Sequence, residues 1–209
     1  MLTSFNKRVG GGGGTYGVVW ALTSKAHFDI PVSGANITFS RKGLSTDTYY
    51  TAVRAWHNIL PQIVDAGGMA IYFVTSETFA LTPFTGPGIS ASQARELLRP
   101  FTDVLGDLGI KYNMTGPTTF PGYLQDYNNF FFPYQVGINQ FGGRLIPRSV
   151  VENNLDGFMA ALRNISEQTA GPCSFAGVVL NVNKTVAGDV DNAVLPAWRD
   201  ALISVNLNR

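Results

Sequence analysis

Charged residues are scarce in this sequence, and the two signs nearly balance. Only 14% of the 209 residues are charged, with 15 basic and 14 acidic side chains and a formal net charge of +1. Soluble chains usually carry about 25% of such residues, so the low fraction indicates that another domain covers part of the surface. The balance gives no electrostatic footprint for nucleic acid or an anionic membrane. No apolar run approaches the roughly 20 residues of a membrane span.

Cysteine and histidine are also rare, which limits the chemistry open to the chain. The lone Cys173 cannot form an internal disulfide, and we interpret it as a small buried apolar residue. No His/Cys metal spacing and no Ser/His/Asp order stand out, which argues against a metalloenzyme and a hydrolase. His27 follows the first expected strand and His57 lies beside Trp56 in an amphipathic segment. Structural roles are therefore favoured for both histidines.

Glycine, in contrast, is concentrated near the start of the chain. Five consecutive glycines at 10–14 lead directly into Thr-Tyr-Gly-Val-Val at 15–19. Without side chains, such a loop can turn tightly and bring several peptide N–H groups to a phosphate or a polar ring edge. It is not a P-loop, since Thr and Tyr follow the last glycine, and the β-branched residues favour a strand over the helix of a Rossmann fingerprint. A flexible linker is the alternative, but linkers rarely end in an aromatic, β-branched run.

Three further motifs follow the glycine segment. They are Lys-Ala-His at 25–27, Gly-Arg-Leu-Ile-Pro-Arg-Ser at 143–149 and Pro-Ala-Trp-Arg-Asp-Ala at 196–201. In this order, the four segments resemble the flavoprotein oxidases related to berberine bridge enzyme and vanillyl-alcohol oxidase, which have a PCMH-type FAD-binding domain. The glycine segment is similar to the end of that domain, and residues 25–36 are most similar to fungal secreted sequences described as isoamyl alcohol oxidases.

The resemblance implies FAD as the cofactor and a particular division of the chain. In that family, most of the FAD domain precedes the glycine segment, and a short FAD-binding tail follows the Pro-Ala-Trp-Arg motif. We therefore expect a fragment, with residues 1–26 as the C-terminal remnant of the FAD-binding domain and 27–209 as a substrate domain without the tail. The residues expected to contact the flavin nucleotide through backbone atoms are Gly12, Gly13, Gly14, Gly17 and Val18.

The resemblance also bears on where the protein acts. The N-terminus has no apolar core of a signal peptide. Four glycosylation sequons begin at Asn36, Asn113, Asn164 and Asn183. Chance supplies roughly two at this composition. Together with the resemblance, they favour a secreted, extracellular parent protein.

The remaining pattern predicts an α+β fold, an antiparallel sheet flanked by helices on one face. Alternation predicts strands at 16–26 and 32–40. Helical spacing predicts a helix at 46–65, which Pro61 kinks or shortens. Strands are expected at 69–75 and 78–83.

The pattern continues with a helix predicted from Ser90 or Ser92 to Leu108, interrupted near Pro100, and a strand at 110–114. The second half of the chain is expected to repeat this succession loosely, with a helix at 150–167 and strands at 175–182 and 196–204.

An aromatic cluster lies between these elements, in Tyr112 and the segment 120–134. Aromatic side chains at this density can form a pocket for an apolar substrate beside a flat cofactor, or pack as core around an irregular segment. The residues we assign to a substrate pocket are Tyr112, Phe132 and Gln140.

A flavin takes a hydride from a substrate carbon, and the protein must supply a base for the hydroxyl proton. In the resembling enzymes, one acid/base group lies just before the Gly-Gly-Arg motif, but residues 134–141 contain no acid here. Tyr134 is therefore the first candidate, whereas Gln140 can only orient a substrate. Arg144 and Arg148 are candidates for pairing with carboxylates, anchoring a turn or forming a domain-interface salt bridge.

Two functions remain open. The first is a fragment of an FAD-dependent oxidoreductase that oxidises an alcohol or related carbon centre, with molecular oxygen as acceptor and the missing FAD-domain segments as partners. The second is a non-catalytic remnant or interaction module that does not bind FAD.

Overall fold

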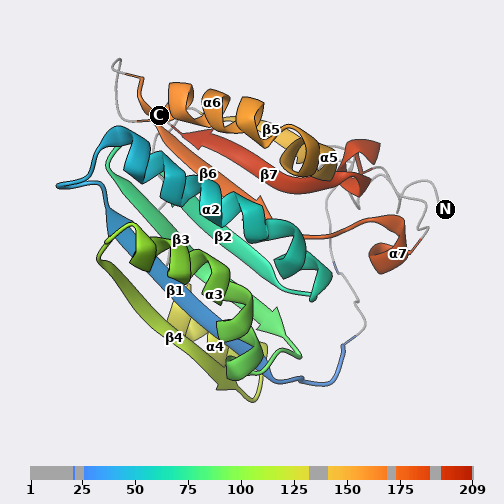
Figure 1. The fold of residues 1–209 in the computed structure, drawn as a ribbon. Coiled ribbons are helices and arrows are strands. Elements are labelled where there is room, and N and C mark those ends of the chain that lie inside the picture. The colour runs from blue at the N-terminus through green and yellow to red at the C-terminus, as the bar shows by residue number, and fades with distance from the viewer. Residues whose placement is uncertain (1–20, 22–25, 132–140, 169–172, 189–193, 209) are drawn as a thin grey trace.

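The computed structural model describes residues 21, 26–131, 141–168, 173–188 and 194–208. These residues form seven strands in a single antiparallel sheet and a set of helices packed against it (Figure 1). No helix among them is long and apolar enough to cross a membrane. The strands are β1 (Val32–Ser40), β2 (Met69–Val74), β3 (Thr78–Pro87), β4 (Tyr112–Phe120), β5 (Phe141–Pro147), β6 (Ser174–Val179) and β7 (Ala201–Asn208).

The spatial order of the strands is β4-β1-β3-β2-β6-β7-β5. Strands β2 and β6, which lie about a hundred residues apart in the sequence, pair antiparallel at the centre, with Tyr72 opposite Gly177. The two halves of the chain therefore share one continuous sheet. The ladder between β1 and β4 shifts register: Gly34 is opposite Thr118 but Asn36 is opposite Thr115, so β4 carries the extra residue of a bulge.

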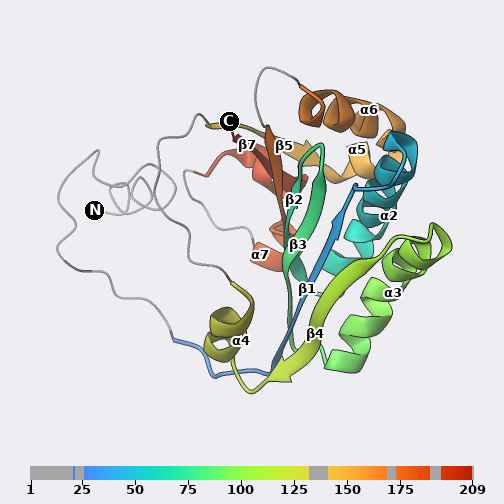
Figure 2. The same ribbon diagram turned by 90° about the vertical axis from the view of Figure 1, so that its left-hand side faces the viewer.

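The helices lie unequally on the two faces of the sheet. Helices α2, α3, α5 and α6 cover one face, and the short helix α4 lies on the other (Figure 2). We call the face opposite α2, α3, α5 and α6 the open face. The helices are α2 (Thr46–Asp65), α3 (Ala91–Asp107), α4 (Tyr123–Phe130), α5 (Arg148–Asn153), α6 (Leu155–Ser166), α7 (Lys184–Ala187) and the 3-10 turn η1 (Pro196–Arg199).

Side-chain caps begin the two long helices. Ser45 accepts a hydrogen bond from the Thr48 amide at the start of α2. Ser90 and Gln93 form a reciprocal capping box at the start of α3, which identifies Ser90 as the cap. These contacts satisfy amide groups that otherwise have no partner at a helix start.

An aromatic core fills the space between the sheet and its covering helices. Trp56 of α2 is fully buried and lies 5.7 Å from the Tyr72 ring and 5.4 Å from the Phe101 ring, measured between centroids. Edge-to-face and tilted arrangements of this kind add to the stabilisation from burial. This core, contributed by β1, β2, β3, β6, β7 and four helices, fixes which strand residues are left for the open face.

The predicted fold class is confirmed: the chain is α+β, with an antiparallel sheet and helices gathered mainly on one face. Strand 32–40 and helix 46–65 have the expected bounds. Most of the expected strand 16–26 lies outside the described residues. So does the segment 1–26 that we expected to be a remnant of an FAD-binding domain, apart from residues 21 and 26.

Two predicted helix features were wrong. Helix α3 continues through Pro100 without interruption, because packing along its buried face holds it together despite one missing N–H donor. Pro61 lies inside α2, which is not shortened there. The single helix expected at 150–167 is two helices, α5 and α6, separated at Asn154, whose φ of -144° and ψ of 43° are not helical.

Several strand bounds also differ from the prediction. The strand expected at 110–114 extends as β4 to Phe120, and the one at 78–83 extends as β3 to Pro87. The last strand begins at Ala201, after the 3-10 turn η1, because a proline at the first position fixes φ for a helical turn. The aromatic segment contains helix α4, and Cys173 is only partly buried.

Candidate functional site

The open face has a hollow of about 450 Å³ over strands β1, β2, β3 and β4. Its lining follows from strand alternation, since in β1 Ile37 and Phe39 are buried in the core, whereas Asn36 and Thr38 point the other way. The residues that line the hollow are Asn36, Thr38, Phe73, Ala80, Thr82, Asn113 and Thr115.

Four of these residues form a polar tetrad, consisting of Asn36, Thr38, Asn113 and Thr115. Asn36 is opposite Thr115, and Thr38 is opposite Asn113, in the ladder between β1 and β4. Each strand therefore contributes one amide and one hydroxyl, and each amide lies opposite a hydroxyl of the other strand. These groups donate and accept hydrogen bonds but do not exchange protons near neutral pH. The tetrad can orient a ligand, and proton transfer requires another group.

The tetrad also explains two of the four sequons. In a strand, the Asn and Thr of an Asn-X-Thr sequence lie on the same face because the side-chain period is two. Asn36-Ile37-Thr38 and Asn113-Met114-Thr115 therefore supply the tetrad.

An acidic side chain is buried beside the hollow, under helix α4. Asp126 is 0% exposed, and its Oδ2 accepts a hydrogen bond of 3.4 Å from the Thr85 hydroxyl. Burial raises the pKa of Asp126 above the ordinary value, and the Thr85 bond lowers it only in part. The carboxyl occupies space that Gly34 leaves free, since a Cβ on Gly34 would lie 2.1 Å from Asp126 Oδ1. Only glycine at this position lets α4 approach so closely.

Asn36 connects this acid to the hollow. Its side-chain amide donates to the Phe130 carbonyl at the end of α4, at 3.4 Å, and it also lines the hollow. Asn36 Oδ1 and Asp126 Oδ1 are both buried and have no hydrogen-bond partner within the described part of the chain. Buried acceptors of this kind are uncommon and call for a donor from water or a ligand.

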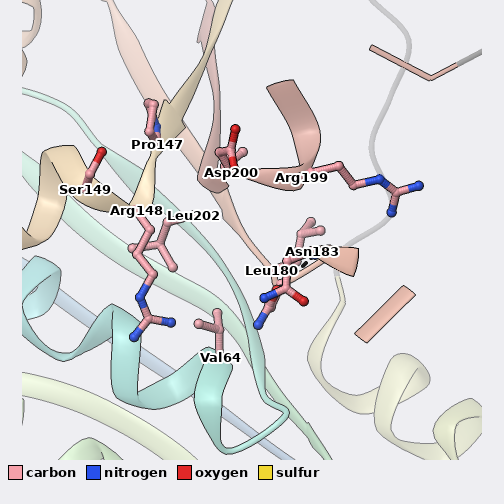
Figure 3. A pocket seen from close by; sticks show the side chains of 11 residues that line it. Val64, Pro147, Arg148, Ser149, Leu180, Asn183, Arg199, Asp200 and Leu202 are labelled. Atoms are coloured by element: carbon pink, nitrogen blue, oxygen red, sulfur yellow. Dashed lines mark hydrogen bonds between the residues drawn. The ribbon is translucent and has the colours of Figure 1, made fainter. Parts of the chain in front are cut away.

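A second hollow, of about 560 Å³, lies at the end of the sheet where two of the sequence motifs meet (Figure 3). The amide of Arg148, from the first motif, donates to the carbonyl of Asp200, from the second, at 2.9 Å. Ser149 and Arg199 also line this hollow. The two motifs, about fifty residues apart, thus form one junction between β5, α5, η1 and β7.

The arginines of this junction have structural partners. Arg148 donates to both carboxylate oxygens of Asp65 and to Glu152, and these bonds raise the pKa of its guanidinium. Arg199 donates to the Val182 carbonyl at 2.8 Å. The expected pairing of Arg148 with carboxylates is confirmed, and Arg144 is exposed on β5. The contacts of both arginines hold elements of the sheet end together, so the junction has a structural role.

Most of the site residues predicted from the sequence lie outside the described residues. This applies to the candidate base, to two of the pocket residues and to the whole set of backbone contacts to the flavin. Tyr112 is described and is paired with Phe39 on β1, which places it on the helix-covered side of the edge strand, away from the hollow. The predicted residues outside the described part are Tyr134, Phe132, Gln140, Gly12, Gly13, Gly14, Gly17 and Val18.

His57 has the structural role expected for it. It is fully buried, and its Nδ1 lies 2.8 Å from the Val53 carbonyl, so this nitrogen must donate. Nε2 then accepts from the Tyr72 hydroxyl at 2.8 Å. Burial lowers the pKa of His57 to about 4, which keeps the ring neutral. His27 is exposed.

The sequence reasoning missed Asp126 and Asn36. A signal for Asp126 was present, because it is the only charged residue between Lys111 and Arg144. An acid in a long uncharged, aromatic segment is a candidate for burial. Asn36 was noticed only as part of a sequon.

Comparison with known proteins identifies relatives of this chain. No protein-family model matches it. It is 42% identical over 204 residues to the FAD-linked oxidoreductase patO of Aspergillus clavatus, covering 95% of this chain and 35% of that protein. It is 31% identical over 206 residues to the VAO-type flavoprotein oxidase VAO615 of Thermothelomyces thermophilus, covering 93% of this chain and 34% of that protein.

Solved structures give the same result. The crystal structure of VAO-type flavoprotein MtVAO615 from Myceliophthora thermophila C1 matches with a TM-score of 0.70 and 26% identity, over 86% of this chain and 33% of that one. MtVAO713 from the same source also gives a TM-score of 0.70, at 15% identity, over 86% of this chain and 34% of that one. At that identity, the second match supports the fold alone.

An antiparallel sheet with helices mainly on one face is thus the fold shared with VAO-type and BBE-like flavoproteins. More particularly, the homologues of this chain are FAD-linked oxidoreductases and VAO-type flavoproteins, which confirms the resemblance expected from the sequence. The chain spans about a third of the length of the curated relatives it matches.

Proposed function

We propose that this chain is the substrate-holding part of an FAD-dependent oxidoreductase that oxidises an alcohol or a related carbon centre. Hydride transfer to FAD and reoxidation by molecular oxygen complete the proposed reaction. The observation that carries the proposal is the uncharged hollow on the open face. The FAD-linked relatives, found over nearly the whole chain, support the choice of cofactor.

The residues of the open face fit a flavin and its substrate. The hollow combines the polar tetrad with the ring of Phe73, and none of its described lining residues is charged. Two buried acceptor oxygens beside it, on Asn36 and Asp126, lack donors within the described residues, and a ring N–H or a substrate hydroxyl could supply them. FAD supplies the hydride acceptor, which no amino-acid side chain provides. We propose 27–209 as the substrate domain, with backbone atoms at 12–14, 17 and 18 contacting the flavin.

The described residues have three tasks in this proposal. The tetrad orients the hydroxyl-bearing carbon through neutral hydrogen bonds, which is the main protein contribution when a cofactor carries the redox chemistry. Phe73 contributes apolar area to the hollow. The sheet itself excludes water from one side of the reacting carbon, because its opposite side is filled by the aromatic core.

A chimaeric enzyme tests the proposal. In the Aspergillus clavatus relative, the residues that match this chain would be replaced by the chain, so that the relative supplies the rest of the enzyme. We expect a yellow protein with the visible spectrum of oxidised flavin and alcohol-dependent oxygen uptake. A folded but colourless chimaera would contradict the proposal and favour the non-catalytic remnant.

Variants of the hollow sharpen that test. Thr38→Val and Asn113→Leu remove hydrogen-bonding groups from the open face, and we expect roughly tenfold lower kcat/KM for each. Thr51→Val, on the exposed side of α2, is the matched control and should leave kcat/KM unchanged. Equal losses in all three variants would show that the hollow has no special role.

FAD titration of the 209-residue chain addresses the remnant hypothesis directly. A glycine loop offers few contacts without a pyrophosphate loop opposite, so we expect weak or no binding by the isolated chain. Micromolar binding would exclude the hypothesis of a remnant that does not bind FAD.

We also propose that the parent protein is secreted. The sequons at Asn164 and Asn183 lie outside the hollow, and Asn164 is exposed on α6. Expression through a fungal secretory pathway should add a glycan at Asn164, which would be measured as a mass loss on enzymatic deglycosylation. An unmodified secreted product would contradict the glycoprotein part of this proposal.

A further inference from the structure

Asp126 lies in surroundings where burying a carboxylate for a structural role alone costs free energy. The elements packed around it are α4, β1, β3 and β4, and none of them contains a lysine or an arginine. The other titratable groups on these elements are tyrosines 112, 123 and 127, and Asp29 lies beside Gly122 at the start of α4. A buried carboxylate without a cation costs more free energy than an apolar residue of the same size.

The hydrogen bonding of Asp126 is also incomplete. One oxygen accepts a long bond of 3.4 Å from Thr85, and the other has no partner within the described residues. Asn36, on the side of β1 that contacts α4, has a second buried acceptor without a donor. The seam between α4 and β1 therefore has two free acceptors among the described residues, and the O–H of an alcohol can donate to one of them.

We propose that the seam between α4 and β1 binds the hydroxyl group of an uncharged alcohol, and that Asp126 is the catalytic base that accepts its proton. This inference rests on the proposed function. In the transfer, the O–H bond of the alcohol breaks, an O–H bond forms on the Asp126 carboxylate, and the electron pair stays on the alcohol oxygen. Bound FAD of the proposed function would accept the hydride from the adjoining carbon, which completes the oxidation of the alcohol.

The ligand class follows from the lining of the hollow. Asn36 belongs both to the seam and to the hollow, so the rest of the ligand would extend over the polar tetrad and Phe73. Among the described residues, no charged side chain lines the hollow, so they offer no cation to a carboxylate or phosphate ligand. An uncharged alcohol with an apolar or aromatic body fits this lining.

Access to Asp126 requires a small shift of α4. This helix has eight residues, and its N-cap residue, Gly122, forms no side-chain cap hydrogen bond. Short helices without caps open locally at low cost in free energy. The buried acid can thus be reached without unfolding the sheet.

Ligand binding by the 209-residue chain tests the inference, with benzyl alcohol as the probe and toluene as the same ring without the hydroxyl. Carbon-13 labelling of aspartate carboxyl groups reports the protonation of Asp126 by NMR, and the Asn36 side-chain amide reports contact. Asp126→Asn keeps a hydrogen-bond acceptor but cannot take up a proton, and Asp126→Leu removes both. Asp107→Asn, at the exposed last position of α3, is the matched control.

We expect benzyl alcohol to shift the Asp126 and Asn36 signals and to bind roughly tenfold more tightly than toluene, the size of a hydrogen bond to a charged group. This preference should increase with pH in the wild type and the control as Asp126 ionises. It should become independent of pH in Asp126→Asn and disappear in Asp126→Leu.

Two results would overturn the inference. One is a hydroxyl preference of the same size and pH dependence in Asp126→Asn as in the wild type. The other is the absence of any Asp126 signal change on adding benzyl alcohol, which is measurable even where Asp126→Leu does not fold. Failure of the proposed function is a separate outcome, because it appears as a chimaera without flavin. A flavin-containing chimaera whose pH–rate profile is unchanged by Asp126→Asn would reject this inference alone.

Discussion

The sheet separates two buried ionisable groups whose surroundings differ. On the helix-covered face, His57 makes two hydrogen bonds of 2.8 Å, to Val53 and Tyr72. On the open face, Asp126 makes one bond of 3.4 Å and leaves an oxygen without a partner within the described residues. Both are 0% exposed. A completed set of bonds is typical of a structural group, whereas an incomplete set beside a hollow is typical of a functional one.

A glycine makes room for each group. Gly177 on β6 accommodates the Tyr72 ring that bonds His57, and Gly34 on β1 accommodates the Asp126 carboxyl. The two positions can therefore be altered in parallel to test whether the two faces differ in their role.

The largest effect is expected from Gly177→Ala. The new Cβ would lie 2.3 Å from the Tyr72 ring, which is fully buried and cannot move aside, so we expect about 3 kcal/mol of destabilisation from overpacking. Urea unfolding measures this change. Gly106→Ala, with no neighbouring atom within 4 Å, is the matched control and should be neutral or slightly stabilising in its helix. Equal stability of the two variants would show that Tyr72 is not held tightly.

The next effect is the contribution of His57 to the pH dependence of the free energy of unfolding. Its pKa falls from 6.5 to about 4 on burial, so the unfolded chain binds more protons between these values. Stability is therefore complete above about pH 6.5 and decreases as the pH falls toward 4, by about 3 kcal/mol at 1.36 kcal/mol per pKa unit. His57→Gln should flatten this dependence, and an unchanged slope would contradict the assignment.

Gly34→Ala should destabilise the protein less, by about 1–2 kcal/mol. The new Cβ would overlap Asp126 and Phe130, but the short helix α4 on the open face can shift away from the sheet. Displacement of α4 should also weaken benzyl alcohol binding. We expect a clear rise in the Kd for benzyl alcohol and only a small fall in the urea midpoint. Gly142→Ala on β5, where nothing lies within 4 Å, is the control. A loss as large as that of Gly177→Ala would remove the distinction between the two faces.

Asp126 should affect stability with the opposite sign to His57. Burial raises its pKa, so the folded chain binds the extra proton, and stability decreases as the pH rises from the ordinary aspartate range through the raised value. Asp126→Asn should therefore stabilise the protein at neutral pH and leave it nearly unchanged in acid, as measured by urea midpoints. Destabilisation at neutral pH would indicate a cation partner that the described residues lack.

The smallest effect is expected at the motif junction. Asp65→Asn breaks the two-bond contact with Arg148, but both side chains are at least one-third exposed, so about 0.5–1 kcal/mol is expected. Salt should reduce this difference, since exposed ion pairs are screened. A loss above that range would indicate that the junction supports more than the sheet end.

Sequence patterns predicted those elements whose signals are local. The apolar spacing of α2, the Ser90 cap and the alternation of β1 each depend on neighbouring residues, and each was correct. The break at Asn154 and the continuity of α3 through Pro100 were missed, because packing between distant segments outweighs the local preference there.

By itself, the sequence determined the relationship to FAD-linked flavoproteins, the α+β class and the neutral, weakly charged surface. Those properties follow from the order of motifs, from periodicity and from composition. The tertiary structure decided that Asn36 and Thr115 are opposite each other, that Asp126 rests on Gly34, and that Tyr112 lies on the covered side. Such pairings depend on register and on the distance between layers, which burial of the whole core sets and which no local stretch of sequence encodes.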